Sequence, residues 1–135
     1  LISKKRPADL LSAVSQLSAA MGCRLIFIGS GELEEDLRSQ AAQCGTNPMF
    51  VGFKNQSELP IHYAAADVIV LPSDGGETWG LVVNEAMACG TPAIVSEACG
   101  CAPDLIEEGR TGFTFATGDV AALAEKLRIM APIAG

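Results

Sequence analysis

Residues 74–92 read D-G-G-E-T-W-G-L-V-V-N-E-A-M-A-C-G-T-P and follow an apolar run at residues 68–71. The apolar run is typical of a buried parallel strand, the polar segment after it of a loop, and residues 79–89 of a helix of about three turns. Thr78 suits the N-cap, Gly90 suits the left-handed position after the last turn, and Pro92 prevents continuation. The stretch therefore predicts a strand, a loop and a helix.

The start of this predicted helix is suited to bind an anion. Its first backbone N–H groups have no partner within the helix, and the peptide dipoles leave a partial positive charge there. Gly80 allows a ligand to approach the backbone closely, and open α/β sheets bind ligands at the carboxyl ends of their strands. We therefore expect a phosphate here, bound by the N–H groups of Trp79, Gly80, Leu81 and Val82.

Two carboxylates flank the expected phosphate position. Glu77 lies in the loop and Glu85 in the helix, with seven residues between them. The side chain of Glu85 leans back towards the helix N-terminus, as side chains on a helix do. Carboxylates accept hydrogen bonds from sugar hydroxyls, whereas backbone N–H groups donate to phosphate oxygens. The pair is therefore spaced to hold hydroxyls on either side of a diphosphate.

Residues 77–92 resemble the signature of the retaining nucleotide-sugar glycosyltransferases with the GT-B fold, often called glycosyltransferases group one. That signature is Glu, seven residues and Glu, with an aromatic-Gly-Leu inside and E-A-M-A-C-G-x-P at its end. Further segments in the family's order and spacing are G-S-G-E-L-E-E-D-L (29–37), F-V-G-F (50–53), A-D-V-I-V-L-P-S (66–73) and E-E-G-R-T-G-F-T-F (107–115). The resemblance covers almost the whole chain.

The resemblance implies an α/β fold, a Rossmann-like parallel sheet with helices on both faces, which is the C-terminal, donor-binding half of a GT-B enzyme. Alternating apolar strands and helices with short turns indicate the same class independently. About five strands can be counted, one fewer than the six of the doubly wound order. We expect residues 1–135 to form a single domain with its first strand truncated and the N-terminal acceptor domain absent.

The resemblance also assigns roles to individual residues. Glu77 would hold the donor sugar near the reacting carbon, as the catalytic residue, and Glu85 would bind the ribose hydroxyls. The residues expected to bind the diphosphate are Thr78, Gly80, Leu81 and Val82, beside Trp79, together with Lys5, for which Lys4 is the competitor. The matching Arg of the family precedes the first residue of this sequence.

Two other segments would border the nucleotide. The glycine turn at Gly29 and Gly31 follows an apolar run, and the resemblance places its backbone beside the pocket, although G-S-G-E-L-E lacks the third Gly of a dinucleotide fingerprint. Phe53 and Lys54 follow another short strand and are candidates to contact the base. An ordinary core position explains Phe53 equally well.

The function that the resemblance implies is transfer of a sugar from a nucleoside-diphosphate sugar to an acceptor, with retention of configuration and without a metal cofactor. One alternative is an isolated nucleotide-binding module without catalysis, because half a cleft neither excludes water nor orients an acceptor. A second alternative is a non-hydrolysing nucleotide-sugar epimerase, against which the Trp79-Gly80-Leu81 sequence argues. A third is a structural oligomerisation domain with exposed apolar surface.

Composition excludes several other classes. The chain has 135 residues, 49% of them apolar, a net charge of −7 and only nine scattered Lys and Arg residues, so a nucleic-acid groove is not expected. No apolar run is long enough to span a bilayer, although the parent enzyme could contact a membrane through its other half. The five cysteines are odd in number and lie mostly among small or apolar residues, which indicates free thiols in a cytoplasmic protein. Cys99 and Cys101 lack two further zinc ligands at a suitable spacing, and the only His is His62.

The remaining elements follow from periodicity and turn residues. Helices are expected at residues 8–21, 32–44, 57–65, 104–108 and 120–130, and strands at 24–29, 49–53, 93–96 and 112–115. Gly45 is expected to close one helix, Ser57 to cap the next, and Asp119 to cap the last. His62 is expected to be a surface residue.

Overall fold

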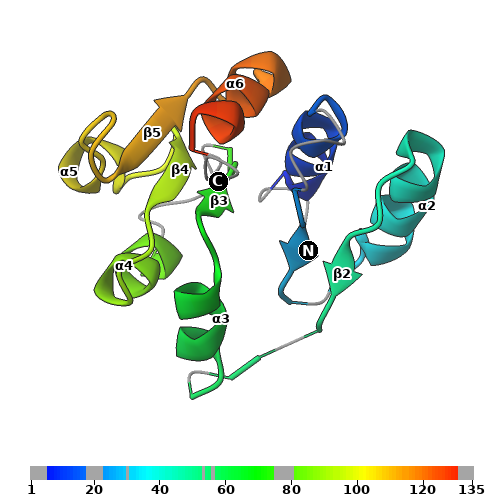
Figure 1. Cartoon of the computed structure of the whole chain (residues 1–135), viewed down its shortest axis with the longest axis horizontal. Helices are drawn as coiled ribbons and strands as arrows, with labels where there is room; N and C mark the ends of the chain where they lie inside the picture. Colours follow the sequence, from blue (N-terminus) through cyan, green and yellow to red (C-terminus); the bar gives the residue numbers. More distant parts are fainter. Residues whose placement is uncertain are drawn as a thin grey trace, which may run out of the picture.

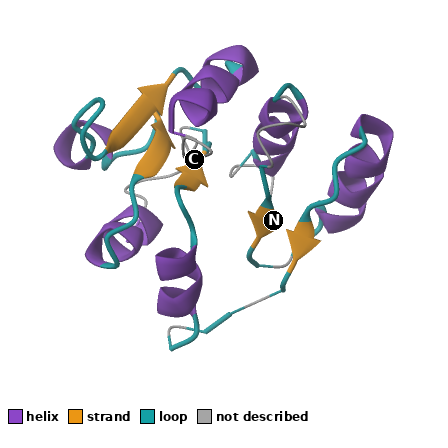
Figure 2. Ribbon diagram, in the orientation of Figure 1, coloured by secondary structure: helices purple, strands orange, loops and turns teal. Residues whose placement is uncertain are grey.

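The computed structural model describes residues 6–17, 23–29, 31–52, 54–55, 57–74 and 81–130. In these ranges six helices alternate with five short strands (Figures 1 and 2). The order is α1 (Pro7–Ser15), β1 (Ile26–Phe27), α2 (Glu34–Cys44), β2 (Met49–Phe50), α3 (Leu59–Ala65), β3 (Ile69–Leu71), α4 (Leu81–Ala88), β4 (Ala93–Ser96), α5 (Ala102–Leu105), β5 (Gly112–Phe115) and α6 (Val120–Met130). None of these helices is both long and apolar enough to cross a membrane.

All strand pairs in the named strands are parallel, which confirms the predicted α/β class. β1 pairs with β2, with Ile26 opposite Met49. β4 lies between β3 and β5, with Ala93 opposite Ile69 on one side and Gly112 on the other. Parallel neighbours require crossover connections, and each of these is made through a helix.

The strands form two sheets within the described residues, whereas one sheet was expected. The sheet orders are β1-β2 and β3-β4-β5. In the doubly wound order 3-2-1-4-5-6, strand 1 separates strand 2 from strand 4. The two observed sheets match the two flanks of that order, with β1 and β2 as its strands 2 and 3.

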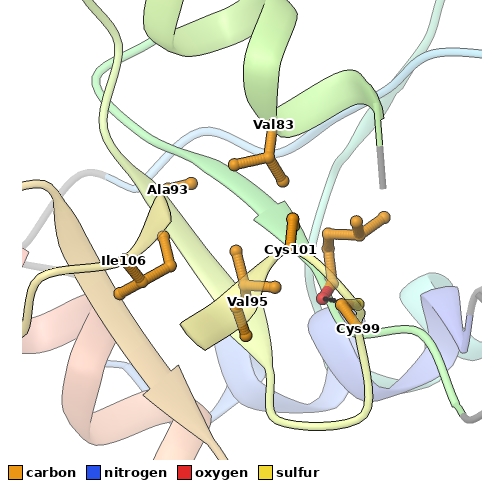
Figure 3. Packing of buried hydrophobic residues seen from close by; sticks show 8 residues of the cluster. Val83, Ala93, Val95, Cys99, Cys101 and Ile106 are labelled. Atoms are coloured by element: carbon orange, nitrogen blue, oxygen red, sulfur yellow. Dashed lines mark hydrogen bonds between the residues drawn. The ribbon is translucent and has the colours of Figure 1, made fainter. Parts of the chain in front are cut away.

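β4 is buried on both of its faces, as a central parallel strand should be. Ala93 and Val95 point to one side, where they pack against α4 and α5; Figure 3 shows them with Val83, Cys99, Cys101 and Ile106. Ile94 points to the other side, into a cluster formed by α1, α6 and β5. Figure 1 shows α4 and α5 on one side of the three-stranded sheet and α1 and α6 on the other.

α1 connects the two sheets, because its side chains pack into the core clusters of both. Leu11 packs with Phe27 of β1 and with Leu37 and Ala41 of α2. Ala13 and Val14 belong to the cluster that contains Ile94 and the apolar side of α6. The helix therefore shares its apolar surface between the two halves of the fold.

Several predicted ends of elements were correct. The strands at 93–96 and 112–115 and the helix at 120–130 have the expected bounds. Asp119 accepts a hydrogen bond from the N–H of Ala122 at 3.0 Å, which confirms its capping role. Gly45 and Gly90 have φ angles of 72° and 81°, as expected after a helix. The five cysteines all lie in the described ranges, and none of them forms a disulfide.

Other predicted ends were wrong. Ser57 does not cap α3, because the side chain of Asn55 accepts the hydrogen bonds from the N–H groups of Ser57 and Glu58, both at 3.0 Å. α1 ends at Ser15, whose hydroxyl bonds to the carbonyl of Ser12 at 2.6 Å and competes with the helical pattern. α5 begins at Ala102, two residues earlier than expected, with Pro103 in its first turn.

Candidate functional site

The candidate site lies where β3 ends and α4 begins. β3 is followed by Pro72, Ser73 and Asp74, and α4 begins at Leu81, so Leu81 and Val82 lie in its first turn as predicted. Gly29, Gly31 and Glu85 are also in the structure. The other predicted site residues, Lys5, Phe53, Glu77, Thr78, Trp79 and Gly80, lie outside the described residues.

Glu85 lies one helical turn beyond Leu81, about 6 Å along the helix axis. Its carboxylate oxygen Oε2 accepts a hydrogen bond from the Tyr63 hydroxyl at 3.0 Å. The residue is partly exposed, so its carboxylate is reachable from solvent. The side chain predicted to bind ribose hydroxyls is therefore already held by a neighbouring helix.

Tyr63 is a buried residue of α3, with 5% of its surface exposed. Its backbone carbonyl accepts a hydrogen bond from the Thr91 hydroxyl at 2.5 Å, which ties α3 to the chain after α4. Burial, together with the hydrogen bond and the negative charge of Glu85, raises the pKa of the Tyr63 hydroxyl above its ordinary value. The hydroxyl therefore stays protonated at neutral pH and acts as a donor to Glu85.

Ser73 places an unsatisfied hydroxyl at the end of β3. Its side chain is fully buried, and among the residues that the structure describes no group forms a hydrogen bond with its Oγ. A buried polar atom without a partner costs about 1–3 kcal/mol, so such atoms are rare away from sites that use them. Its place beside Asp74 puts this atom next to the loop that the sequence analysis assigned to the donor.

The glycine turn after β1 begins at Gly29. Gly29 has a φ angle of 114°, and its N–H donates to the carbonyl of Gly52 at 2.9 Å. Among the residues that the structure describes, no atom lies within 4 Å of the position where a Cβ of Gly29 would be. Gly31 is exposed, and its carbonyl accepts from the N–H of Glu34 at 3.3 Å.

Arg6 brings a positive charge to the carboxyl ends of the strands. Its Nε lies 2.6 Å from Asp9 Oδ2, and its guanidinium lies against Gly118, in the loop after β5. The hydrogen bond and the charge of Asp9, with a smaller effect from the charge of Asp74 after β3, raise the pKa of Arg6. The guanidinium is therefore near the ends of both β3 and β5.

Arg6 also has an unusual backbone conformation. Its φ and ψ angles are 47° and 50°, a left-handed conformation at the N-cap of α1. Among the described residues, Arg6 is the only non-glycine residue with a positive φ angle. A side chain in this region costs about 1–2 kcal/mol, and strained backbone of this kind is common at binding sites.

We expect Arg6→Gly to be more stable than Arg6→Ala by about 1 kcal/mol. Both variants lose the ion pair with Asp9, so their difference isolates the backbone conformation at φ 47°. Urea denaturation of the two variants measures it. Equal stability, or a more stable alanine variant, would show that residue 6 is not held in the left-handed region.

Sequence reasoning did not identify Tyr63, Ser73 or Arg6 as site residues. Tyr63 and Glu85 are 22 residues apart on different helices, so no spacing rule links them. Ser73 is the first polar residue after β3, and nothing else in the sequence distinguishes it. For Arg6, the adjacent basic residues at 4 and 5 were a signal, but they directed attention to Lys5.

Comparison with known proteins decides the family. Residues 1–131 match the sequence profile of the family described as "Glycosyl transferases group 1". The chain belongs to the group 1 glycosyltransferases. This membership agrees with the resemblance carried by the two-glutamate motif, and with the parallel α/β fold described above.

Two relatives with similar sequences are both named as sugar transferases. The chain is 39% identical over 132 residues to sulfoquinovosyl transferase SQD2 of Arabidopsis thaliana, covering 96% of this chain and 25% of that protein. It is 34% identical over 134 residues to the GDP-mannose-dependent monoacylated alpha-(1-6)-phosphatidylinositol monomannoside mannosyltransferase of Corynebacterium glutamicum, covering 94% and 35% of the two chains. The chain thus spans about a quarter to a third of the length of these relatives.

Solved structures give the same fold. The chain superposes on Anabaena HepE in complex with UDP with a TM-score of 0.85 and 27% sequence identity. The match covers 96% of this chain and 36% of HepE. The Rossmann-like α/β class predicted from the sequence is therefore confirmed, because the similar solved structures are GT-B glycosyltransferases.

Proposed function

We propose that this chain is the donor-binding domain of a retaining glycosyltransferase that moves a sugar from a nucleoside-diphosphate sugar to an acceptor. The observation that carries this proposal is the start of α4 after β3, with Glu85 held one turn into the helix by Tyr63. Membership of the group 1 family and the UDP complex of HepE support it. In this proposal Glu77 is the catalytic residue that holds the donor sugar.

The positive charge for the diphosphate would come from the protein. The first turn of α4 offers N–H groups and a favourable dipole, and Lys5 would add an ammonium group. Arg6 contributes a guanidinium near Asp74. These groups stabilise charge that builds up on the leaving diphosphate, which is the usual electrostatic role in transfer chemistry. We therefore propose that transfer needs no divalent metal, and that added EDTA leaves it unchanged.

The rest of the enzyme is part of the proposal. The chain spans only 25% of the Arabidopsis relative, so the acceptor site would belong to a separate N-terminal domain. In the doubly wound order a further strand lies between the positions of β1 and β3. We propose that one further strand of the parent enzyme pairs with both β1 and β3. We also propose that the parent enzyme acts in the cytoplasm.

Calorimetry with UDP, GDP and ADP tests the proposal, since the named relatives use UDP and GDP-mannose. We expect one base to be preferred, and Glu85→Ala to weaken its binding about tenfold or more, which is about 1.4 kcal/mol. Glu125→Ala is the matched control, because it removes the same charge from the exposed side of α6. Equal affinity of the Glu85 variant and the wild type would contradict the site assignment.

The shortness of the chain favours one second candidate, a nucleotide-binding module that catalyses nothing by itself. A single domain does not enclose the cleft that excludes water and orients an acceptor. We expect the 135-residue chain to bind donor without transferring its sugar. Clear turnover of a nucleotide sugar by this chain would exclude the module.

A further inference from the structure

We propose that Tyr63 is a positioning residue for the nucleotide: its hydroxyl fixes the Glu85 carboxylate by one oxygen, so that the other oxygen faces the ribose hydroxyls. This inference rests on the proposed function, because it deepens the role given to Glu85. It adds a residue of α3 to a site that was assigned to the loop and helix after β3. Tyr63 itself contacts no ligand in this proposal.

The geometry of the pair supports a fixed carboxylate. The Tyr63 hydroxyl donates to Oε2 of Glu85 at 3.0 Å, which leaves Oε1 for another donor. A glutamate side chain has three torsions, and the last of them is broad. One bond to a rigid donor therefore removes much of the freedom that ligand binding would otherwise have to restrict.

The donor is itself rigid. The Tyr63 ring is buried, with 5% of the residue exposed, and its backbone carbonyl is bonded to Thr91 at 2.5 Å. Thr91 follows the end of α4, and its own N–H donates to the carbonyl of Ala86 in α4 at 3.0 Å. Tyr63 is therefore anchored, through Thr91, to α4, the helix that carries Glu85.

The hydroxyl cannot easily lose its proton, which keeps the direction of the hydrogen bond fixed. Burial and the neighbouring carboxylate both raise the pKa of Tyr63. Glu85 then always accepts from Tyr63 at Oε2, and a ribose hydroxyl would donate to the remaining oxygen. This polarity suits a vicinal diol, whose hydroxyls serve as donors.

The competing explanation is purely structural. A buried tyrosine hydroxyl needs a partner, and Glu85 could serve only to satisfy it. In that case Tyr63→Phe would change stability and leave ligand selectivity untouched. A positioning role instead predicts that the loss depends on the ribose hydroxyls and on the presence of Glu85.

The test is a double-mutant cycle on the 135-residue chain, with UDP and GDP as probes and the 2′,3′-dideoxy form of the tighter one. We expect Tyr63→Phe to weaken binding of the ribose form about fivefold to tenfold, and binding of the dideoxy form less than about twofold. In the Glu85→Ala background we expect Tyr63→Phe to have no further effect on either form. Ala41→Gly in α2 is the control for a general loss of stability.

The outcomes separate the inference from the proposed function. If wild type binds and Glu85→Ala weakens binding, but Tyr63→Phe leaves the affinity for the ribose form unchanged, the inference fails and the proposed function stands. Equal losses for the ribose and dideoxy forms, or a Tyr63→Phe loss that persists without Glu85, also overturn the inference. If the folded wild-type chain binds none of UDP, GDP and ADP, the proposed function fails and the inference fails with it.

Discussion

Gly112→Ala is expected to destabilise the chain by about 3 kcal/mol or more. Gly112 lies opposite Ala93 in the pairing of β4 and β5, and a Cβ at this position would be 1.7 Å from the carbonyl oxygen of Ala93. The obstructing atom belongs to the backbone of a central strand, so it cannot move aside as a flexible side chain would. The strand pairing itself must shift to accept the methyl group.

Gly109→Ala is the matched control for this substitution. Gly109 has a φ angle of 79°, but no described residue comes within 4 Å of its Cβ position. Its replacement therefore costs only the left-handed conformation, about 1 kcal/mol. Urea denaturation of the two variants gives both values. A Gly112 variant no less stable than the Gly109 variant would contradict the observed register of β4 and β5.

The fold could be predicted to a large extent, because it depends on patterns that are local in the sequence. The apolar run at 93–96 and the turn glycines Gly45 and Gly90 specify their elements without reference to distant residues. The division into two sheets could not be predicted in this way. The division depends on which strands form hydrogen bonds with each other, and the periodicity of apolar residues does not specify strand pairing.

The candidate site divides in the same manner. Leu81, Val82 and Glu85 were predicted to lie on one helix from a motif in one short stretch, and they all lie on α4. Tyr63 reaches Glu85 only through the packing of α3 on α4, and Asn55 rather than Ser57 receives the N–H groups before α3. Contacts between elements depend on tertiary packing, which the order of residues does not reveal.

The role of α1 as the connection between the two sheets leads to a prediction for Leu11→Ala. Leu11 is fully buried against β1 and α2, so we expect a loss of about 3 kcal/mol from the missing contacts and the cavity. Because Leu11 faces only this half, we expect faster amide hydrogen exchange in β1 and α2 than in β4, β5 and α6. Mass spectrometry of deuterated peptides measures the difference.

Val14→Ala tests the contact of the same helix with the other cluster. Val14 packs in the cluster of Ile94 and α6, so its truncation is expected to raise exchange in β4 and α6 first. Alanine has a higher helix propensity than either leucine or valine, so a loss of propensity in α1 does not explain faster exchange in either variant. If both variants raised exchange equally in both halves, the two sheets would unfold as one unit and α1 would not divide them. If each substitution instead raises exchange mainly in its own half, the two sheets unfold separately. A partner strand between β1 and β3 would then be needed to make them unfold cooperatively, because α1 alone does not.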